Sequence, residues 1–487
     1  MKRKLLAILT LVVMLFSTMA FTACESGPAT GNSGDLGGTE DIIPDPGKDL
    51  TEIPEGGYDG SAVTIRFYHT MGKNLSTVLE KYIGEFNKIY PNIKIAHEQV
   101  GSYDDVKSQI STQISEGLQP HVAYCYPDHV ATYNISGAVQ TLDILINDPD
   151  LGLTEEQIAD FIPGYYEEGR EFGDGLMYTM PFSKSTEVLY YNKTFFDKHG
   201  LTPPKTWAEL RTLCERLIEI DPNCIPLGYD SEANWFITMC EQLGTTYTSA
   251  TGNKYVFDTP ENRAFVAEFC DWYYNGLVTT QEILKAYTST LFTSTDEVKS
   301  YMSIGSSAGA THQRPEKVEG KYPFEVGIAS IPQVVDPATN PDYQPKVISQ
   351  GPSVCIFKKT NPQETIASWL FVKYLTTSVA FQADFSIASG YVPVIKSVDT
   401  DEAYIEHLAA ADGTDGIAAL SSKVCLEQAD YYYTSPAFNG SSLARERVGA
   451  LIQNCFIACT TGVDTDAIAN EFIAAVRYCE SMAPSKK

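Results

Sequence analysis

Residues 63–95 carry the pattern of a strand, a helix and a second strand. Residues 63–68 (Val-Thr-Ile-Arg-Phe-Tyr) alternate between apolar and polar side chains, as a half-buried strand does. Apolar side chains then recur at helical spacing over residues 78–89, Pro91 ends this stretch, and residues 93–95 (Ile-Lys-Ile) begin another strand. Because a β-α-β unit joins parallel strands and packs its helix against them, the pattern predicts an α/β fold.

Two further features extend this pattern. Thr77 and Glu80 have the spacing of a capping box, which predicts that the helix begins just after Thr77. Strand-like residues return at 354–357, and a helical pattern follows through residues 369–375. The sequence shows no internal repeat, and its 487 residues are enough for two sizeable lobes.

The segments that follow the expected strands are rich in Gly, Ser, Thr and Tyr. In open α/β sheets, ligands bind beyond the carboxyl ends of the strands. Backbone N–H groups, hydroxyls and flat aromatic faces suit polyols, sugars or phosphates better than bond-breaking chemistry. These segments are residues 69–72, 124–128, 181–186, 305–309 and 351–353.

The N-terminus has the marks of an export signal. A cationic start at residues 1–4 precedes an apolar run over 5–16, which is too short to span a bilayer comfortably. Small residues then lead to Cys24, and residues 21–24 (Phe-Thr-Ala-Cys) resemble the bacterial lipobox, although Phe21 departs from its usual leucine. We therefore predict a signal peptide over residues 1–23 and a lipid on Cys24, which places the protein on the outer face of the plasma membrane.

Residues 24–60 consist mainly of Gly, Pro, Asp, Glu, Ser and Thr. Such a segment has too few large apolar side chains to offset the entropy of the chain. We predict that it is a disordered linker between the lipid anchor and a folded body.

Charge and cysteine usage exclude several classes of function. The formal net charge of −27 argues against nucleic-acid binding, which requires basic patches. The eleven cysteines are scattered, with no CxxC pair and no accompanying histidine framework, so a metal site and a cofactor are not expected. With Cys24 lipidated, ten cysteines remain, and the sequence does not decide between disulfides and buried thiols.

One motif favours an enzyme. Residues 305–309 (Gly-Ser-Ser-Ala-Gly) fit the G-x-S-x-G elbow of α/β-hydrolases, with Ser307 as the nucleophile. A triad needs a downstream histidine, and His312 is too near in sequence, which leaves His407. Because the segment after Gly309 leaves little room for the expected helix, we favour a binding protein that is not an enzyme.

Residues 180–201 (Met-Pro-Phe-Ser-Lys-Ser-Thr-Glu-Val-Leu-Tyr-Tyr-Asn-Lys-Thr-Phe-Phe-Asp-Lys-His-Gly-Leu) and 203–207 (Pro-Pro-Lys-Thr-Trp) together resemble the family-1 extracellular solute-binding proteins of ABC importers. The likeness covers nearly the whole body and is greatest to the members that bind glycerol-3-phosphate. It implies a two-lobed, periplasmic-binding-protein-like fold of type II with a ligand cleft between the lobes. It also implies a monomer that delivers its ligand to membrane permease subunits.

The resemblance further implies domain boundaries. The N-terminal lobe is expected at residues 61–181 plus 348–400, and the C-terminal lobe at 182–347 plus 401–482. Residues 189–192 are expected to be a strand that crosses between the lobes.

The resemblance also assigns ligand-binding residues. They are Tyr103, Ser185, Ser306, Gly351, Tyr391 and Arg445, with Arg447 as the alternative to Arg445. Hydroxyls, backbone N–H groups and a guanidinium are the groups that bind phosphate. Trp235 and the tyrosines at 431–433 are looser candidates for the cleft.

The sequence departs from the family at Pro127, where the glycerol-3-phosphate-binding members have a glutamate that contacts glycerol hydroxyls. Asp128 follows and is the expected substitute. The ligand therefore stays open between a small polyol phosphate, such as glycerol-3-phosphate or a glycerophosphodiester, and a sugar. The alternatives are an oligosaccharide-binding protein of a carbohydrate importer, a secreted hydrolase that uses Ser307, and a receptor for sensing rather than uptake.

Overall fold

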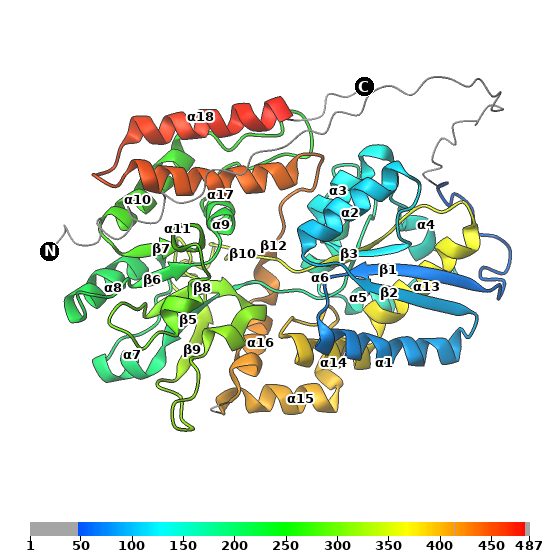
Figure 1. The fold of residues 1–487 in the computed structure, drawn as a ribbon, viewed down its shortest axis with the longest axis horizontal. Coiled ribbons are helices and arrows are strands. Elements are labelled where there is room, and N and C mark those ends of the chain that lie inside the picture. Colours follow the sequence, from blue (N-terminus) through cyan, green and yellow to red (C-terminus); the bar gives the residue numbers. More distant parts are fainter. Residues whose placement is uncertain (1–46, 414, 483–487) are drawn as a thin grey trace, which may run out of the picture. The chain divides into compact units, whose positions relative to one another are not determined.

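The computed structural model describes residues 47–413 and 415–482 (Figure 1). The expected signal peptide, Cys24 and the first part of the expected linker lie outside these residues. Two five-stranded sheets, each packed with helices, organise the chain. The predicted α/β fold with two lobes is confirmed.

The first sheet has the strand order β2-β1-β3-β11-β4. Its strands are β1 (Val63–His69), β2 (Ile93–Gln99), β3 (Val122–Cys125), β4 (Met180–Pro181) and β11 (Ser353–Ile356). Strand β1 runs parallel to β2 and β3, with Val63 opposite Ile93, whereas β11 runs antiparallel to β3 and β4. The helices of this lobe include α1 (Lys73–Ile89), α2 (Tyr103–Ser115), α3 (Pro127–Tyr133), α13 (Pro362–Thr377) and α14 (Val379–Ser389).

The second sheet has the order β7-β6-β8-β5-β9. Its strands are β5 (Glu187–Asn192), β6 (Leu227–Tyr229), β7 (Val278–Thr280), β8 (Met302–Ser306) and β9 (Val326–Ser330). Strands β6, β7 and β8 are parallel, and β5 is antiparallel to β8 and β9. The long helices of this lobe are α8 (Trp207–Ile220), α9 (Glu232–Leu243), α10 (Pro260–Tyr274), α17 (Ser441–Ala458) and α18 (Thr465–Met482).

Shorter elements complete the described chain. They are α4 (Asp143–Ile146), α5 (Glu155–Asp160), α6 (Pro163–Glu167), α7 (Lys193–His199), α11 (Gln281–Leu284), α12 (Ser289–Phe292), α15 (Glu402–Ala409), α16 (Ile417–Glu427), the 3-10 helices η1 (Asn134–Ser136), η2 (Glu168–Arg170), η3 (Ser307–Gln313), η4 (Lys396–Thr400), η5 (Ala410–Asp412) and η6 (Ala429–Tyr431), and the paired strands β10 (Val347–Ile348) and β12 (Tyr432–Tyr433).

Two chain segments that pass between the two sheets lie side by side, and a segment of the first lobe packs beside them. The backbone of Ser185 exchanges hydrogen bonds with Gln350 of the second crossing, and Lys184 exchanges hydrogen bonds with Val392 of the first lobe. The two crossing segments form part of the hinge. It lies just before β5, so the expected crossing strand at residues 189–192 instead belongs to the second sheet.

Gly351 is required by the close packing of this hinge. Its φ of +89° is favourable for glycine alone, and a Cβ there would meet the carbonyl oxygen of Ser183 at 2.5 Å. The neighbouring Lys184 is fully buried and pairs with the carboxylate of Glu168. Lys184 Nζ also donates to the carbonyl oxygen of Gly351 at 3.2 Å and to Ser353 Oγ at 3.0 Å, so the buried ion pair ties the crossing segments together.

Helix α1 begins one turn earlier than the sequence predicted. It starts at Lys73 after Gly72, and no side chain caps it. Thr77 therefore lies inside the helix, where its Oγ1 donates to the carbonyl oxygen of Lys73, and the predicted capping box with Glu80 is wrong.

The described part of the expected linker, residues 47–60, packs on the first lobe. Leu50 is buried in the core of that lobe, and its backbone N–H donates to Gln140 Oε1 at 2.8 Å. The backbone of Lys48 pairs with Lys359, just after β11. The ordered body therefore begins before residue 60. At the other boundary, Tyr404 on α15 lies in the core of the first lobe, although residue 404 was expected in the second.

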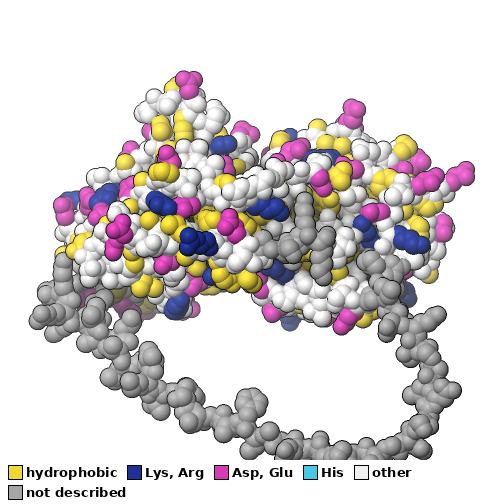
Figure 2. All heavy atoms as spheres, turned by 90° about the horizontal axis from the view of Figure 1, so that it is seen from above, with side chains coloured by type: hydrophobic (Ala, Val, Ile, Leu, Met, Phe, Trp, Pro, Cys, Tyr) yellow, Lys and Arg dark blue, Asp and Glu magenta, His cyan; other side chains and the backbone are white. Residues whose placement is uncertain are grey.

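The surface carries charged side chains of both signs. Figure 2 shows acidic side chains scattered over the face in view, with lysines and arginines between them. Within residues 47–413 and 415–482, no helix has the length and hydropathy needed to cross a membrane.

All ten cysteines in residues 47–413 and 415–482 are buried free thiols, and Cys125 and Cys355 have their sulfur atoms 3.6 Å apart.

Candidate functional site

A cleft of about 730 Å³ is lined by residues from both lobes. Part of its lining follows the carboxyl ends of strands, as expected for an open α/β sheet. Residues 126–129 come directly after β3, residues 230–234 after β6, and residues 281–282 after β7. Residues 349–351, residues 434–437, the start of α2 and one side of α17 from Ser441 to Gln453 supply most of the other lining residues.

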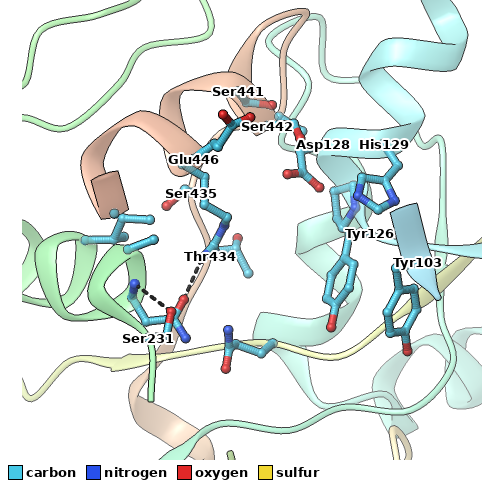
Figure 3. Close-up of a pocket in the computed structure, with 18 of the residues that line it drawn as sticks. Tyr103, Tyr126, Asp128, His129, Ser231, Thr434, Ser435, Ser441, Ser442 and Glu446 are labelled. Atoms are coloured by element: carbon cyan, nitrogen blue, oxygen red, sulfur yellow. Dashed lines mark hydrogen bonds between the residues drawn. The ribbon is translucent and has the colours of Figure 1, made fainter. Parts of the chain in front are cut away.

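The wall from the first lobe is aromatic. Tyr103 at the start of α2 and Tyr126 after β3 have ring centroids 4.7 Å apart, and Figure 3 shows them beside each other. Burial raises the pKa values of both hydroxyls, so they stay protonated at neutral pH. His129 packs edge-on against Tyr126, and burial lowers the pKa of its imidazole. This wall offers flat faces and neutral hydroxyls to a ligand.

Asp128 supplies a carboxylate to the same wall. It occupies the first turn of α3, directly after Pro127, which begins the helix. Figure 3 shows the Asp128 side chain directed into the cleft, toward Ser441 and Ser442 on the other side. A carboxylate in this position can accept hydrogen bonds from ligand hydroxyls or amines.

The opposite wall is built around Arg445, on α17. Its Nη1 donates to Asn234 Oδ1 at 2.5 Å, and the Asn234 side-chain amide donates to Glu187 Oε1 at 3.0 Å. The hydroxyl of Tyr229 donates to the other oxygen of Glu187 at 2.6 Å. Arg445 is part-exposed in the cleft lining, whereas Asn234 and Glu187 are buried behind it. The arginine is therefore held by a chain of hydrogen bonds that ends in a buried carboxyl group.

Two other acids of the second lobe are already engaged by the protein. Asp230 Oδ1 accepts hydrogen bonds from the backbone N–H and the hydroxyl of Thr288, each at 2.7 Å. Glu232 Oε1 accepts from the backbone N–H of Glu282 at 3.1 Å. Burial raises the pKa of both carboxyls.

One polar contact joins the lobes across the cleft. Lys107 Nζ, on α2, donates to Ser442 Oγ, on the first turn of α17, at 3.0 Å. Helix α17 begins after Gly440 and has no side-chain cap, so N–H groups of its first turn face the cleft region with a partial positive charge. Lys107, Ser442 and the start of α17 thus bring an ammonium group, a hydroxyl and helix N–H groups to one part of the cleft, where Asp104 and Glu446 also belong to the lining.

Four of the seven ligand-binding residues predicted from the sequence line the cleft. They are Tyr103, Asp128, Gly351 and Arg445. Arg447, the alternative to Arg445, instead pairs with Glu446 and lies over the ring of Tyr478, outside the cleft lining. Asp128, the expected substitute for a glutamate at the position of Pro127, also lines the cleft.

The structure places the other three predicted residues outside the lining. Ser185 is buried in the hinge, where its backbone pairs with Gln350. Ser306 ends β8 and caps η3 by accepting a hydrogen bond from the backbone N–H of Ala308. Tyr391 lies behind Tyr103 and shares a hydrogen bond with it. Ser185 thus belongs to the hinge, Ser306 to the turn after β8, and Tyr391 to the surroundings of Tyr103.

Several lining residues were not singled out from the sequence. They include Lys107, Tyr126, His129, Ser231, Asn234, Tyr247, Thr434, Ser435, Ser441 and Ser442. The sequence does indicate Ser231 and Asn234 as candidates, because both follow the short strand β6, which consists of Leu-Gly-Tyr. Trp235 and Tyr433, named as looser candidates, are buried in the core of the second lobe.

The Ser307 motif is not exposed as a nucleophile elbow. Ser307 is buried, and its Oγ accepts a hydrogen bond from the backbone N–H of Thr186 at 3.1 Å. A short 3-10 helix, not an α-helix, follows it. His407 stacks on Tyr404 in the first lobe. Within the described chain, no group of three or more His, Cys, Asp or Glu side chains is arranged to hold a metal ion.

Comparison with protein families identifies one match. The family of bacterial extracellular solute-binding proteins matches residues 81–411. Sn-glycerol-3-phosphate-binding periplasmic proteins from Salmonella typhimurium and Yersinia pestis are each 31% identical over 174 residues. That alignment covers 35% of this chain and 38% of the relatives' length.

Solved structures agree with the two-lobed fold over most of the chain. The cyclic α-maltosyl-1,6-maltose-binding protein from Arthrobacter globiformis is similar with a TM-score of 0.65 at 18% identity, covering 86% of this chain and 99% of its own. The UgpB protein of Mycobacterium tuberculosis, solved with glycerophosphocholine, has a TM-score of 0.65 at 18% identity over 86% of this chain and 98% of its own. Because both proteins are only 18% identical to this chain, the similarity shows a shared fold and does not extend to the ligand.

Proposed function

The chain belongs to the bacterial extracellular solute-binding proteins, and from that premise we propose that it captures a small polyol phosphate, such as glycerol-3-phosphate or a glycerophosphodiester. The observation that carries the proposal is Arg445, whose guanidinium is held at the cleft wall by Asn234. A fixed guanidinium can bind phosphate oxygens through two parallel hydrogen bonds. The relatives that bind sn-glycerol-3-phosphate support this ligand class.

The surroundings of Arg445 suit a phosphate ester. The hydroxyls of Ser441 and Ser442 lie on the first turn of the same helix, and Lys107 reaches Ser442 from the other lobe. Asp128 and the hydroxyls of Tyr103 and Tyr126 then offer partners for the polyol. A phosphate beside Arg445 and Lys107 and polyol hydroxyls beside Asp128 and the two tyrosines would engage both sets of groups.

A sugar is the second candidate, and the size of the cleft favours it. A volume of about 730 Å³ lies well inside the range for drug-sized ligands and exceeds what a single glycerol phosphate fills. Tyr103 and Tyr126 offer faces on which sugar rings stack. Several structural neighbours are named as maltose- or maltodextrin-binding proteins, which supports an oligosaccharide as the alternative.

We further propose that the protein works as the receptor of an ABC importer. In this proposal a lipid on Cys24 holds a monomer at the outer face of the plasma membrane, and the closed form docks on the permease subunits. Closure about the hinge at Lys184, Ser185 and Gln350 would trap the solute. A sensing role is distinguished by the genes beside this one, because an uptake receptor is expected next to permease genes.

Isothermal titration calorimetry with glycerol-3-phosphate, glycerophosphocholine and maltotriose tests the ligand class. The polyol-phosphate proposal predicts that Arg445→Ala weakens the phosphorylated ligands at least tenfold more than maltotriose. Arg447→Ala is the matched control, because that guanidinium lies over Tyr478, outside the cleft lining. Equal losses for charged and neutral ligands would rule out the phosphate role of Arg445. Turnover of an ester or glycoside that is abolished by Ser307→Ala would refute a binding function without catalysis.

A further inference from the structure

Glu187 lies behind the cleft wall, at the first residue of β5, and is almost completely buried. Its two carboxyl oxygens are used by the protein: Oε2 accepts from Tyr229 and Oε1 accepts from Asn234. The ligand therefore meets Arg445, and Arg445 meets Glu187 only through Asn234. None of the cleft functions described above uses this carboxyl group directly.

The contact with Glu187 decides which way the Asn234 amide faces. An asparagine side chain has one end that donates hydrogen bonds and one that accepts them. Because Glu187 accepts at Oε1, the amino end of Asn234 turns inward, and its oxygen faces outward to accept from Arg445. If the amide were reversed, two donors would face each other at Arg445. The buried carboxyl group thus fixes the position of the Arg445 guanidinium through the side chain of Asn234.

The charges around Glu187 are few and come from three directions. Arg445 on α17 favours its ionised form, whereas Asp230 after β6 disfavours it. Tyr229 on β6 and Tyr433 on β12 face the same carboxyl group with neutral hydroxyls. Burial outweighs the favourable contacts and raises the pKa of Glu187 to about 7. The carboxyl group is therefore poised to change charge near neutral pH when its surroundings change.

We propose that Glu187 is a positioning residue that orients Arg445 through Asn234 and takes up a proton when an anionic solute binds at Arg445. This inference rests on the proposed function of the cleft. The anion neutralises the positive charge that favours ionised Glu187, so the protonated carboxyl becomes more favourable. The proton goes to Oε2, where the Tyr229 hydroxyl turns from donor to acceptor, and Oε1 still accepts from Asn234, which leaves the orientation of Arg445 unchanged. Binding of a neutral sugar leaves that balance of charge unaltered.

Calorimetry in buffers of different ionisation enthalpy measures the protons taken up per solute bound. The probe is glycerophosphoglycerol, a phosphodiester with a single negative charge throughout the range, because a phosphate monoester would itself titrate near pH 6. The expected result is proton uptake that is greatest near pH 7 and absent with maltotriose. Glu187→Gln keeps an acceptor for Asn234 and a donor toward Tyr229, so this variant should bind glycerophosphoglycerol without proton uptake.

A second variant and a control complete the test. Asn234→Ala removes the link, and it should weaken glycerophosphoglycerol at least tenfold more than it weakens maltotriose, for which Asn234 is only a lining residue. Glu219→Gln removes one carboxylate from the exposed surface of α8 and should keep the proton uptake of the wild type. Binding of glycerophosphoglycerol to the wild type without proton uptake, or uptake that persists in Glu187→Gln, would overturn the inference while the proposed function stands. Failure to bind any polyol phosphate would instead overturn the proposed ligand class, and the inference with it.

Discussion

Lys107 and Ser442 come from different lobes and meet at 3.0 Å across the cleft, the ammonium group donating to the hydroxyl. Lys107 projects from α2 of the first lobe, and Ser442 lies on the first turn of α17. The contact joins a helix of each lobe, so it can form only while the lobes are together. It therefore belongs to the closed state.

Lys107→Met should shorten the lifetime of the closed complex. The methionine keeps most of the length of the side chain but loses the charged donor, which contributes about 1 kcal/mol at a part-exposed position. We expect roughly a fivefold rise in the dissociation rate of a bound solute, measured by stopped-flow fluorescence. Lys94→Met, an exposed lysine on β2, is the control. An unchanged dissociation rate in Lys107→Met would show that this contact does not hold the lobes closed.

Gly351→Ala should destabilise the hinge. Both strain at φ +89° and the 2.5 Å approach of a Cβ to the Ser183 carbonyl oppose the alanine. Gly56→Ala is a matched control, since Gly56 has φ +81° and a Cβ added there would have nothing within 4 Å. We expect Gly56→Ala to cost about 1 kcal/mol of unfolding free energy and Gly351→Ala about 2 kcal/mol more. Urea titrations measure the difference, and equal costs would contradict the close packing.

Replacing one member of the buried pair of Lys184 and Glu168 should lower the free energy of unfolding more than replacing both members. Lys184→Met leaves the Glu168 carboxylate buried without its cation, which typically costs about 3–5 kcal/mol. The double variant Lys184→Met, Glu168→Leu removes both charges and should recover much of that loss. Chemical unfolding of the two single variants and the double variant measures the coupling. Additive losses would indicate that the two side chains do not act as a pair.

The free energy of unfolding should depend on pH because the pKa of Glu187 differs between the folded and the unfolded chain. Its pKa is raised from 4.5 to about 7, so the folded protein keeps a proton that the unfolded chain releases between these values. Stability relative to Glu187→Gln should therefore fall by roughly 3 kcal/mol as pH rises from 4.5 to 7.5. Comparing the two proteins at each pH cancels the contributions of buried histidines such as His69, whose pKa is lowered to about 4. A flat difference would show that Glu187 has an ordinary pKa.

The sequence predicted the secondary structure well where hydrophobic periodicity was strong. The strands expected at 63–68 and 354–357 are found at 63–69 and 353–356, and the expected helix lies between β1 and β2. The start of that helix was wrong, because a plausible cap at Thr77 lies within it and the true start has no side-chain cap. Helix ends depend on where the preceding strand and turn leave the chain, which local spacing does not contain.

The candidate site was predictable in part. Asp128 and Tyr103 follow strand ends or begin a helix, and such positions converge on one edge of a sheet. Asn234 and Ser442 were missed because they come from segments about 200 residues apart that only the tertiary fold brings to one cleft. Glu187 was present in the family signature, yet its burial and its link to Arg445 depend on how β5 packs beside β6 and α9.

The contacts of residues 47–60 have a mechanical consequence. Leu50 and Lys48 join the chain to the first lobe, on the side of the hinge that carries β11. Any pull along the chain from its N-terminal side is therefore received by the first lobe and does not pass through the hinge. In the proposed lipid-anchored protein, the first lobe would be the one held by the anchor, and the second lobe, with Arg445 and α17, would move relative to it. Such an attachment would leave the opening and closing of the cleft free of load.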